Sequence, residues 1–439
     1  MSEAVTTRQQ ELAGKYRPYP EYKDSGVEWL QLCPSSWETK ALKYIVSCND
    51  EVLSESTDPD MEFEYIDIGG VSSSEGITRT ESMRFSGAPS RARRIVRQGD
   101  IIVSTVRTYL EAIAPISLEF DGKIASTGFA VLRPKYLLSG FAKYALRARH
   151  FIDSVVARST GVSYPAINSS ELIDIKIVVP SLKEQQTIAS FLDYETARID
   201  RLIAQQQRLI ELLKEKRQAV ISHAVTKGLN PNAPMKDSGV EWLGQVPEHW
   251  KVGSLRWYLR VSSGEYLSNQ HFDLEPSESA IYPVIGGNGV MGYTSHKNQA
   301  TPLVVGRVGA LCGNVHLVDG ECWVTDNALL IGLSSKISVN FAAHYLKSLN
   351  LNKLANQNTQ PLITGTMIKD QNIALPSLHE QSEIVEFVTQ EEQKLNLLVA
   401  KAEQAIVLMQ ERRTALIAAA VTGKIDLRGW TTPADEVAV

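Results

Sequence analysis

The sequence is poor in cysteine and has no excess of basic charge. Its 439 residues include four cysteines, and 45 lysines and arginines stand against 50 acidic residues, which makes the formal net charge −5. No C-x-x-C pair occurs, so we interpret the cysteines as reduced, structural thiols of a cytoplasmic protein. The acidic balance excludes a globally basic surface, and any binding of nucleic acid must use local basic patches.

Long apolar segments are also missing. No apolar run approaches the roughly 18 residues that a membrane-spanning helix needs, so we expect no contact with a membrane. The first ten residues, MSEAVTTRQQ, lack a basic start followed by an apolar stretch, which argues against a secretory signal. The length and the content of 43% hydrophobic and 22% charged residues are those of a globular chain with two or three domains.

Motifs that carry chemistry are absent or misplaced. There is no G-x-x-x-x-G-K-[ST] phosphate loop, no clear pair of nuclease carboxylates and no Asn-Pro-Pro-aromatic string of amino-methyltransferases. Residues 287–292, GNGVMG, fit G-x-G-x-x-G, but a dinucleotide site needs a helix next, and YTSHKNQATP is a poor helix. His316 lies near Cys312 and Cys322 at no standard zinc spacing. We therefore expect a glycine hairpin or a DNA-facing loop at 287–292, no metal site, and no catalysis by this chain alone.

The chain does contain a long internal repeat. The octapeptide KDSGVEWL occurs at 23–30 and again at 236–243, and the following PSSW and PEHW keep the same offset of 213. A second pair of similar segments begins at Pro180 and Pro376, with an offset of 196. The chain therefore consists of two copies of one unit, each with an opening tag, a divergent middle and a closing segment.

The two closing segments are predicted to be long helices. Ser181 with Glu184, and Ser377 with Glu380, form S-x-x-E capping boxes directly after a proline. Apolar residues then recur in alternating steps of four and three, and each pattern continues for about 40 residues, or roughly 60 Å, to a terminal glycine. The predicted seam residues are Ile188, Leu192, Ile199, Leu202, Leu209 and Leu213 in the first helix, and Ile384, Val388, Leu395, Leu398 and Met409 in the second.

Polar interruptions match between the two seams, which suggests that the helices pack on each other. A plain helix hairpin inside one domain and a rigid spacer between two modules both fit this pattern.

The divergent middles, 38–173 and 251–369, are predicted to be β-rich. Short runs of β-type residues at 101–103, 130–132, 303–305 and 329–331 stand between clusters of Gly, Ser and Asn. The two middles align weakly, so we expect a shared fold with different loops. The first middle also carries seven arginines between 79 and 107, where a solvated charged face and a DNA-binding patch are about equally good interpretations.

This order of tags, modules and helices resembles the specificity subunit of type I restriction-modification systems. The resemblance rests on the two tags, on P-S-L-x-E-Q at 180–185 and 376–381, and on the ending V-T-G-K-I at 421–425, whose internal partner at 225–229 is looser. It implies an α+β architecture in which two mixed α/β target recognition domains are joined by two long antiparallel helices that form a coiled coil, with a pseudo-two-fold internal repeat.

The implied domains are the first target recognition domain with its tag at 1–173, the first helix at 174–229, the linker, second tag and second target recognition domain at 230–369, and the second helix and tail at 370–439. In such an arrangement the N-terminal tag would lie beside the end of the C-terminal helix, as the internal tag follows the first helix.

The resemblance also implies a function. Each module would read one half of a bipartite site in double-stranded DNA, while the helices set the spacing and dock two methyltransferase subunits, with restriction subunits as further partners. No cofactor is expected in this chain, because S-adenosylmethionine, ATP and Mg would belong to the partners. Two alternatives are a scaffold or adhesion-type protein with two modules on a helical stalk, and a self-sufficient methyltransferase or nuclease.

The candidate DNA-binding residues follow from their position in the modules. Any of them could contact phosphate or be structural instead, and His296 alone fits a surface residue better than a base reader. The candidates are Arg91, Arg93, Arg94, Arg97, Ser104 and Arg107 in the first module, and Asn288, His296 and Arg307 in the second.

Overall fold

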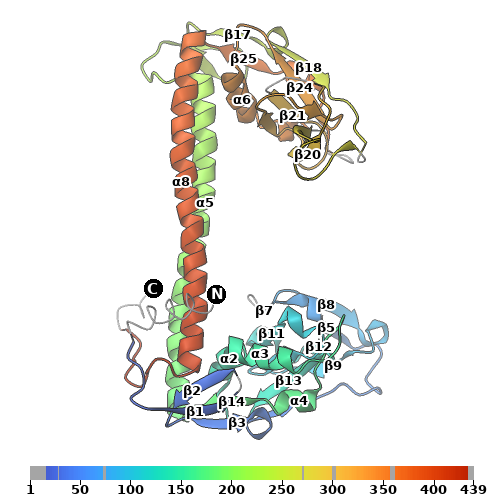
Figure 1. Cartoon of the computed structure of the whole chain (residues 1–439), viewed down its shortest axis with the longest axis vertical. Helices are drawn as coiled ribbons and strands as arrows, with labels where there is room; N and C mark the ends of the chain where they lie inside the picture. The colour runs from blue at the N-terminus through green and yellow to red at the C-terminus, as the bar shows by residue number, and fades with distance from the viewer. Residues whose placement is uncertain are drawn as a thin grey trace. The chain divides into compact units, whose positions relative to one another are not determined.

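The computed structural model (Figure 1) describes residues 16–27, 29–72, 76–268, 271–298, 303–355 and 361–433. Two compact units divide the chain. Unit 1 consists of residues 1–205 with 405–439, and unit 2 consists of residues 206–404. The boundaries lie within the two long helices, so each unit contains one module and a part of both helices.

The module of unit 1 contains two four-stranded sheets. The first, an antiparallel sheet with the order β11-β10-β13-β4, consists of β4 (Val46–Cys48), β10 (Ile101–Ser104), β11 (Ile113–Pro115) and β13 (Phe129–Pro134). The second, with the order β8-β5-β12-β9 and a parallel pair β5 and β12, consists of β5 (Glu62–Ile66), β8 (Glu81–Arg84), β9 (Ala92–Ile95) and β12 (Ile124–Ser126). A small hairpin pairs β6 (Val71–Ser72) with β7 (Gly76–Ile77).

The central strand β10 explains why this module folds as two layers. All of Ile101, Ile102 and Val103 are fully buried. Ile101 and Val103 belong to the large core that also contains helical residues, whereas Ile102 belongs to the separate core on the other face. Because side chains alternate along a strand, an uninterrupted apolar run requires cover on both faces. The helices of this module are α2 (Ser139–Ala145), α3 (Arg149–Ala157) and α4 (Ser169–Ile173).

The module of unit 2 repeats this plan. Its antiparallel sheet has the order β18-β24-β21-β22, and its second sheet has the order β20-β19-β23. The strands are β18 (Leu259–Ser263), β19 (Tyr282–Gly286), β20 (Gly289–Thr294), β21 (Leu303–Gly306), β22 (Val315–Leu317), β23 (Trp323–Val324) and β24 (Ala328–Leu333), and the helices are α6 (Val339–Ser348) and α7 (Gly365–Lys369). All four predicted β-type runs are confirmed as strands, and the G-x-G-x-x-G segment forms the β19–β20 hairpin.

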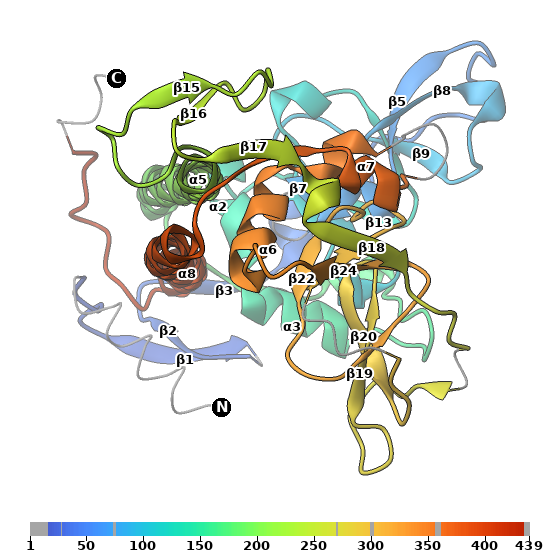
Figure 2. The same ribbon diagram turned by 90° about the horizontal axis from the view of Figure 1, so that it is seen from above.

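Four small two-stranded sheets connect the tags and helices to the modules. They pair β1 (Tyr22–Val27) with β2 (Leu30–Pro34), β3 (Glu38–Ala41) with β14 (Lys176–Val179), β15 (Met235–Asp237) with β16 (Gln245–Pro247), and β17 (Lys251–Ser254) with β25 (Asn372–Leu375). Figure 2 shows the β1–β2 pair beside α8 and the β15–β16 pair near α5. The two copies of the repeated octapeptide therefore begin equivalent hairpins.

The predicted long helices are present as α5 (Leu182–Lys227, 46 residues) and α8 (Leu378–Val421, 44 residues). The first capping box is complete, because Ser181 Oγ accepts from the Glu184 amide and Glu184 accepts from the Ser181 amide, both at 3.3 Å. At the second, Ser377 Oγ accepts from the Glu380 amide at 3.3 Å, and the carboxylate of Glu380 accepts from the indole of Trp250 at 2.9 Å. Each helix is followed by a left-handed glycine, Gly228 or Gly423. None of the described helices is long and apolar enough to span a membrane.

Within each unit, the two helices run in opposite directions. In unit 1, Ile188 and Leu192 near the start of α5 share a core with Leu416 and Ala420 near the end of α8. In unit 2, the end of α5 and the start of α8 share a core in the same way. The hydroxyl of Tyr22 donates to the carbonyl of Gly423 at 2.9 Å, so the N-terminal tag lies beside the end of α8, as the family resemblance implies.

The register of the helix seam differs from the prediction in its middle part. Seven predicted seam residues are buried and Met409 is partly buried, but Leu202, Leu209 and Leu398 are 40%, 42% and 47% exposed. Ile210, one position after Leu209, is only 8% exposed. Between residues 199 and 213 of α5, the buried or partly buried residues are Ile199, Ile203, Gln206, Ile210 and Leu213, and between residues 395 and 409 of α8 they are Leu395, Val399, Ala402, Ala405, Ile406 and Met409.

In both helices, the spacing between successive buried residues thus contains one more step of four residues than the predicted pattern, near the start of the helix. A straight α-helix drifts by about 20° per heptad from a strict repeat of 3.5, and an added step of four returns the apolar stripe to the partner. The three leucines lie one position beside the stripe, so their assignment to the seam is corrected.

Candidate nucleic-acid interface

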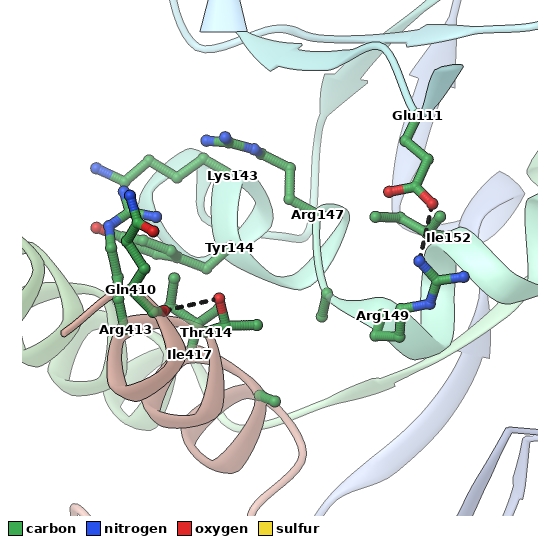
Figure 3. A pocket seen from close by; sticks show the side chains of 12 residues that line it. Glu111, Lys143, Tyr144, Arg147, Arg149, Ile152, Gln410, Arg413, Thr414 and Ile417 are labelled. Carbon is green, nitrogen blue, oxygen red and sulfur yellow. Dashed lines mark hydrogen bonds and ion pairs between the residues drawn. The ribbon is translucent and has the colours of Figure 1, made fainter. Parts of the chain in front are cut away.

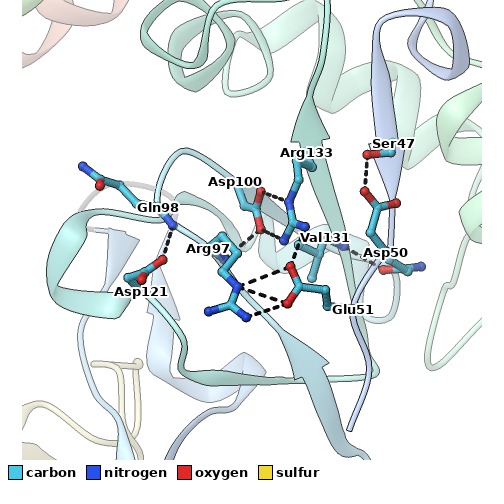
Figure 4. A network of polar contacts seen from close by, with 10 residues as sticks. Ser47, Asp50, Glu51, Arg97, Gln98, Asp100, Asp121, Val131 and Arg133 are labelled. Atoms are coloured by element: carbon cyan, nitrogen blue, oxygen red, sulfur yellow. Dashed lines mark hydrogen bonds and ion pairs between the residues drawn. The ribbon is translucent and has the colours of Figure 1, made fainter.

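The candidate arginines of the first module differ in whether an acidic side chain compensates their charge. Arg97 forms a bidentate contact with Glu51, from Nε at 3.1 Å and Nη2 at 2.6 Å. Figure 4 shows that Glu51 also accepts from Arg133, which in turn donates to the buried Asp100. Hydrogen bonds from Arg97 and Arg133 lower the pKa of Glu51 to about 2. Arg97 is therefore a member of an ion network that joins β10 and β13, and its charge is compensated.

Arg93 and Arg94 lie on β9 without an acidic partner among the residues that the structure describes. The guanidinium of Arg93 lies 4.8 Å from the ring centroid of Phe85 and donates to the carbonyl of Ala92 at 3.0 Å. The Nε of Arg94 is buried and meets no acceptor in the described part of the chain. Both residues are partly buried and leave positive charge uncompensated at this edge of the sheet.

Arg91 and Arg107 lie on loops that meet at the turn between β12 and β13. The carbonyl of Arg91 accepts from the amide of Thr127 at 2.7 Å, and the amide of Thr105 donates to Gly128 at 2.8 Å. Arg91 has a weak ion pair with Asp67 at 3.5 Å. Arg107 is exposed and lies 5.0 Å from the ring centroid of Tyr164.

Ser104 does not fit a role in binding DNA. Its side chain is 3% exposed and donates to the carbonyl of Val106 at 2.5 Å. It is the last residue of the buried strand β10, and its hydrogen bond to Val106 stabilises the turn that follows this strand. The assignment of Ser104 as a candidate is corrected on this ground.

In the second module, the structure brings Arg307 and Asn288 to the same region. Arg307 donates from Nη1 to Ser263 at 3.0 Å, and its amide donates to the carbonyl of Asn327 at 2.9 Å. A Cβ added at Gly287, next to Asn288, would lie 3.1 Å from the Val308 oxygen and 3.2 Å from the Asn327 oxygen. The exposed hairpin turn at Asn288 therefore lies against the loop of Arg307.

His296 lies elsewhere on this module. It follows β20, whereas Asn288 precedes this strand of six residues, which separates the two by roughly 20 Å. Its Nδ1 is 3.1 Å from the Ser295 hydroxyl, and its side chain is exposed. The structure thus groups two of the three predicted residues of the second module and leaves His296 at the other end of the hairpin.

A family model described as the type I restriction modification DNA specificity domain matches the chain twice, over residues 34–212 and 247–406. The chain belongs to this DNA specificity family. The match confirms the resemblance predicted from the tags and the two P-S-L-x-E-Q segments, because each matched region contains one module and most of the long helix that follows it.

Individual members of the specificity family are distant from this chain. It is 32% identical to the EcoprrI specificity subunit of Escherichia coli over 124 residues, which cover 28% of this chain and 31% of that protein. It is 26% identical to the EcoKI specificity subunit of Escherichia coli strain K12 over 67% of this chain and 68% of that protein. A chain from a structure of type I R-M complex assembly and conformational transition shares its fold, with a TM-score of 0.73 at 21% identity over 90% of this chain and 99% of that one.

Sequence reasoning missed one part of the surface of this specificity-family chain. Tyr109, Leu110, Val162 and Tyr164 are exposed apolar or aromatic side chains on two loops next to Arg107. The short stretch STGVSYP at 159–165 contains the only available signal, an aromatic residue among turn-forming ones. The arginines were predicted because of their charge, and this uncharged loop was not predicted for the same reason.

A second feature that sequence reasoning missed is a cavity of about 480 Å³ in unit 1, between α2, α3 and α8 (Figure 3). Lys143, Arg149 and Arg413 line it, but each has an acidic partner: Lys143 has Asp193 at 2.6 Å, Arg149 has Glu111 at 2.8 Å, and Arg413 has Asp200 at 3.1 Å. Burial lowers the pKa of Arg147 in the same wall. Because most of the charge is compensated, this cavity is a weaker candidate for phosphate than the loops of Arg91 and Arg107.

Proposed function

We propose that this chain is the DNA sequence-recognition subunit of a type I restriction-modification complex and that it is not itself an enzyme. The observation that carries the proposal is the duplicated match to the DNA specificity domain, which falls on two modules whose antiparallel sheets have the same strand order. Arg93 and Arg94 on β9 and Arg107 on its loop have no acidic partner among the described residues and fit this role, whereas a scaffold that binds proteins or glycans would not need them.

Each module reads one half of a bipartite site in double-stranded DNA. The two modules share the strand order of their antiparallel sheets but differ in the side chains on their loops. One module has Arg91 and Arg107 there, and the other has Asn288 and Arg307. Phosphate contacts supply much of the affinity and make it dependent on salt, while a few contacts to base edges in each module supply the sequence preference.

The helices α5 and α8 form an antiparallel coiled coil that acts as a spacer, and the two copies of the unit are related by a pseudo-two-fold axis. The packing at the helix ends supports this arrangement, because the start of each helix shares a hydrophobic core with the end of the other. The extra step of four recurs at the same place in both helices. A symmetric pair of readers would suit two half-sites in opposite orientation.

Two methyltransferase subunits dock on this coiled coil. In unit 2, Leu209 and Leu212 of α5 and Leu397 and Leu398 of α8 are each about half exposed. Two helices alone cannot cover these side chains, and a partner helix would remove them from water. S-adenosylmethionine, ATP and Mg bind to the methyltransferase and restriction subunits and not to this chain, and the assembly acts on DNA in the cytoplasm.

A genome-wide map of adenine methylation, in the host with and without this gene, tests the proposal. Loss of one bipartite motif with a fixed gap is the expected result. An unchanged map, together with failure of methyltransferase subunits to copurify with the chain, would overturn it. Exchange of residues 251–369 for another module should change one half of the motif and keep the other.

A further inference from the structure

Arg107 has a backbone conformation that an arginine rarely adopts. It caps the short 3-10 helix η4 (Thr108–Leu110) with φ +51°, in the left-handed region. A Cβ in this region crowds the neighbouring carbonyl oxygen, which is why glycine usually occupies such positions. Non-glycine residues in this conformation gather at functional sites, where the side chain justifies the strain.

The second module shows that the fold itself does not need this arginine. The amide of Thr105 donates to Gly128 and its carbonyl accepts from Ile167, as the amide of Arg307 donates to Asn327 and its carbonyl accepts from Ile363. Thr105 and Arg307 are therefore equivalent positions at the end of equivalent strands. Two residues later, the second module has Gly309 with φ +93° where the first has Arg107.

The side chain of Arg107 is held by an aromatic ring. Its guanidinium carbon lies 5.0 Å from the ring centroid of Tyr164, within the range of a cation–π contact. The loop of Tyr164 is closed by two bonds between Thr160 and Ala166, each 2.9 Å long. The amide of Thr108 donates to Pro165 at 3.4 Å, which joins this loop to η4. Tyr164 therefore has a defined position beside Arg107.

No acidic side chain in the described ranges forms an ion pair with Arg107, unlike Arg79, Arg84 and Arg97. The N–H donors of a guanidinium lie in its own plane, so a guanidinium held over a ring keeps them available to other acceptors. Two such parallel donors match O6 and N7 of guanine in the major groove, and the rigid planar fork that holds them in this geometry is absent from lysine.

We propose that Arg107 reads a guanine in the half-site of the first module, with Tyr164 as its positioning residue. This inference rests on the proposed function of the chain. It assigns a base contact to the first module, and it explains why an arginine stands where glycine would fit the backbone better.

The decisive variant is Arg107→Gly, which restores the residue of the second module and relieves the backbone, so its thermal midpoint should equal or exceed that of the wild type. The full chain, in complex with its methyltransferase subunits, is used to select duplexes from a random-sequence library. Wild type should enrich a bipartite motif. The variant should accept all four bases at one guanine of one half-site, with binding to the wild-type motif weakened roughly 5- to 100-fold and the other half-site unchanged.

Glu111→Gly is the matched control, because Glu111 closes the same 3-10 helix with φ +52°. Its partner Arg149 keeps Asp153 at 2.6 Å, so this variant should keep the wild-type motif. Arg107→Lys should weaken the guanine preference although it keeps the charge, because lysine lacks the planar fork. Tyr164→Phe should keep the preference and Tyr164→Ala should weaken it, which separates positioning by the ring from a role of the hydroxyl.

Three results would overturn the inference. An Arg107→Gly motif identical to that of the wild type would remove Arg107 from recognition. Weaker binding to every duplex, with the salt slope reduced by about one, would make it a phosphate contact instead. If the wild-type complex enriches no motif, the proposed function fails as well, and that result is distinct from the first two.

Discussion

Arg413 of α8 lies beside Asp200 of α5, with 3.1 Å between Nε and Oδ1. The contact is an ion pair without hydrogen-bond alignment, since the same Nε has no acceptor in a suitable direction among the described residues. The equivalent positions in unit 2 are Arg217 and Asn396, where Arg217 donates to the amide oxygen at 2.9 Å. The two units thus share one interhelical contact, with an anion in one and a neutral amide in the other.

Exchange of these two partners should have small and opposite effects. Asp200→Asn should lower the free energy of unfolding of unit 1 by up to about 1 kcal/mol at low salt, because Asp200 is half exposed and solvent screens the pair. Asn396→Asp should add a similar ion pair in unit 2. Urea unfolding at low and high salt measures both, and a loss above 2 kcal/mol that is independent of salt would contradict the screened-pair interpretation.

The corrected seam predicts different roles for neighbouring residues of α5. Ile210→Ala should destabilise the helix pair by about 2 kcal/mol, because it removes a buried side chain. Leu209→Ala should cost less than about 1 kcal/mol, because this side chain is already half in water. Thermal unfolding of the two variants, one position apart, is the comparison. Equal losses would favour the original register. Leu209→Ala should in addition reduce copurification of the methyltransferase if the exposed leucines are its docking surface.

Acid should weaken the ion network around Glu51. The pKa of Glu51 is depressed from an ordinary value of 4.5 to about 2, so the unfolded state takes up a proton at higher pH than the folded state. The stability contribution is complete above about pH 4.5 and is lost as the pH falls towards 2. Urea unfolding between pH 6 and 3 should show a steeper decline for the wild type than for Glu51→Gln, whose side chain does not titrate. Parallel curves would contradict the role of this carboxylate.

The spacer proposal predicts that the gap between half-sites follows helix length. Removal of one heptad from each helix, residues 203–209 and 399–405, keeps the seam in register and shortens the pair by about 10 Å. Because base pairs are stacked about 3.4 Å apart, the gap in the methylation motif should shorten by about three base pairs while both half-sites stay the same. An active variant with an unchanged gap would refute the spacer role.

Sequence patterns were sufficient for the two long helices and the central strands, but not for the short helices of the modules or for the register of the seam. The β-type runs are so apolar that they form central strands in any mixed sheet, and the capping boxes begin α5 and α8 where predicted. The seam shift could not be found from the pattern, because leucine or isoleucine stands at 202, 203, 209 and 210 alike. Only the partner helix selects one of each pair.

The candidate site likewise combines features that the sequence predicts with features that only the folded chain reveals. A local sequence pattern identified the cluster of arginines, but it could not tell Arg97, paired with Glu51 from 46 positions away, from Arg107, which has no such partner in the described residues. It could not place Tyr164 beside Arg107 either, because β strands and α3 separate them in the sequence.

By itself, the sequence determined the duplicated unit, the long helices, the central strands and the family, since these depend on periodicity, capping and repeated segments that are local in the chain. The tertiary structure alone decided the seam register, the compensation of each arginine and the left-handed turn at Arg107 against Tyr164. These depend on contacts between segments far apart in the sequence, whose energies arise only when the chain is folded.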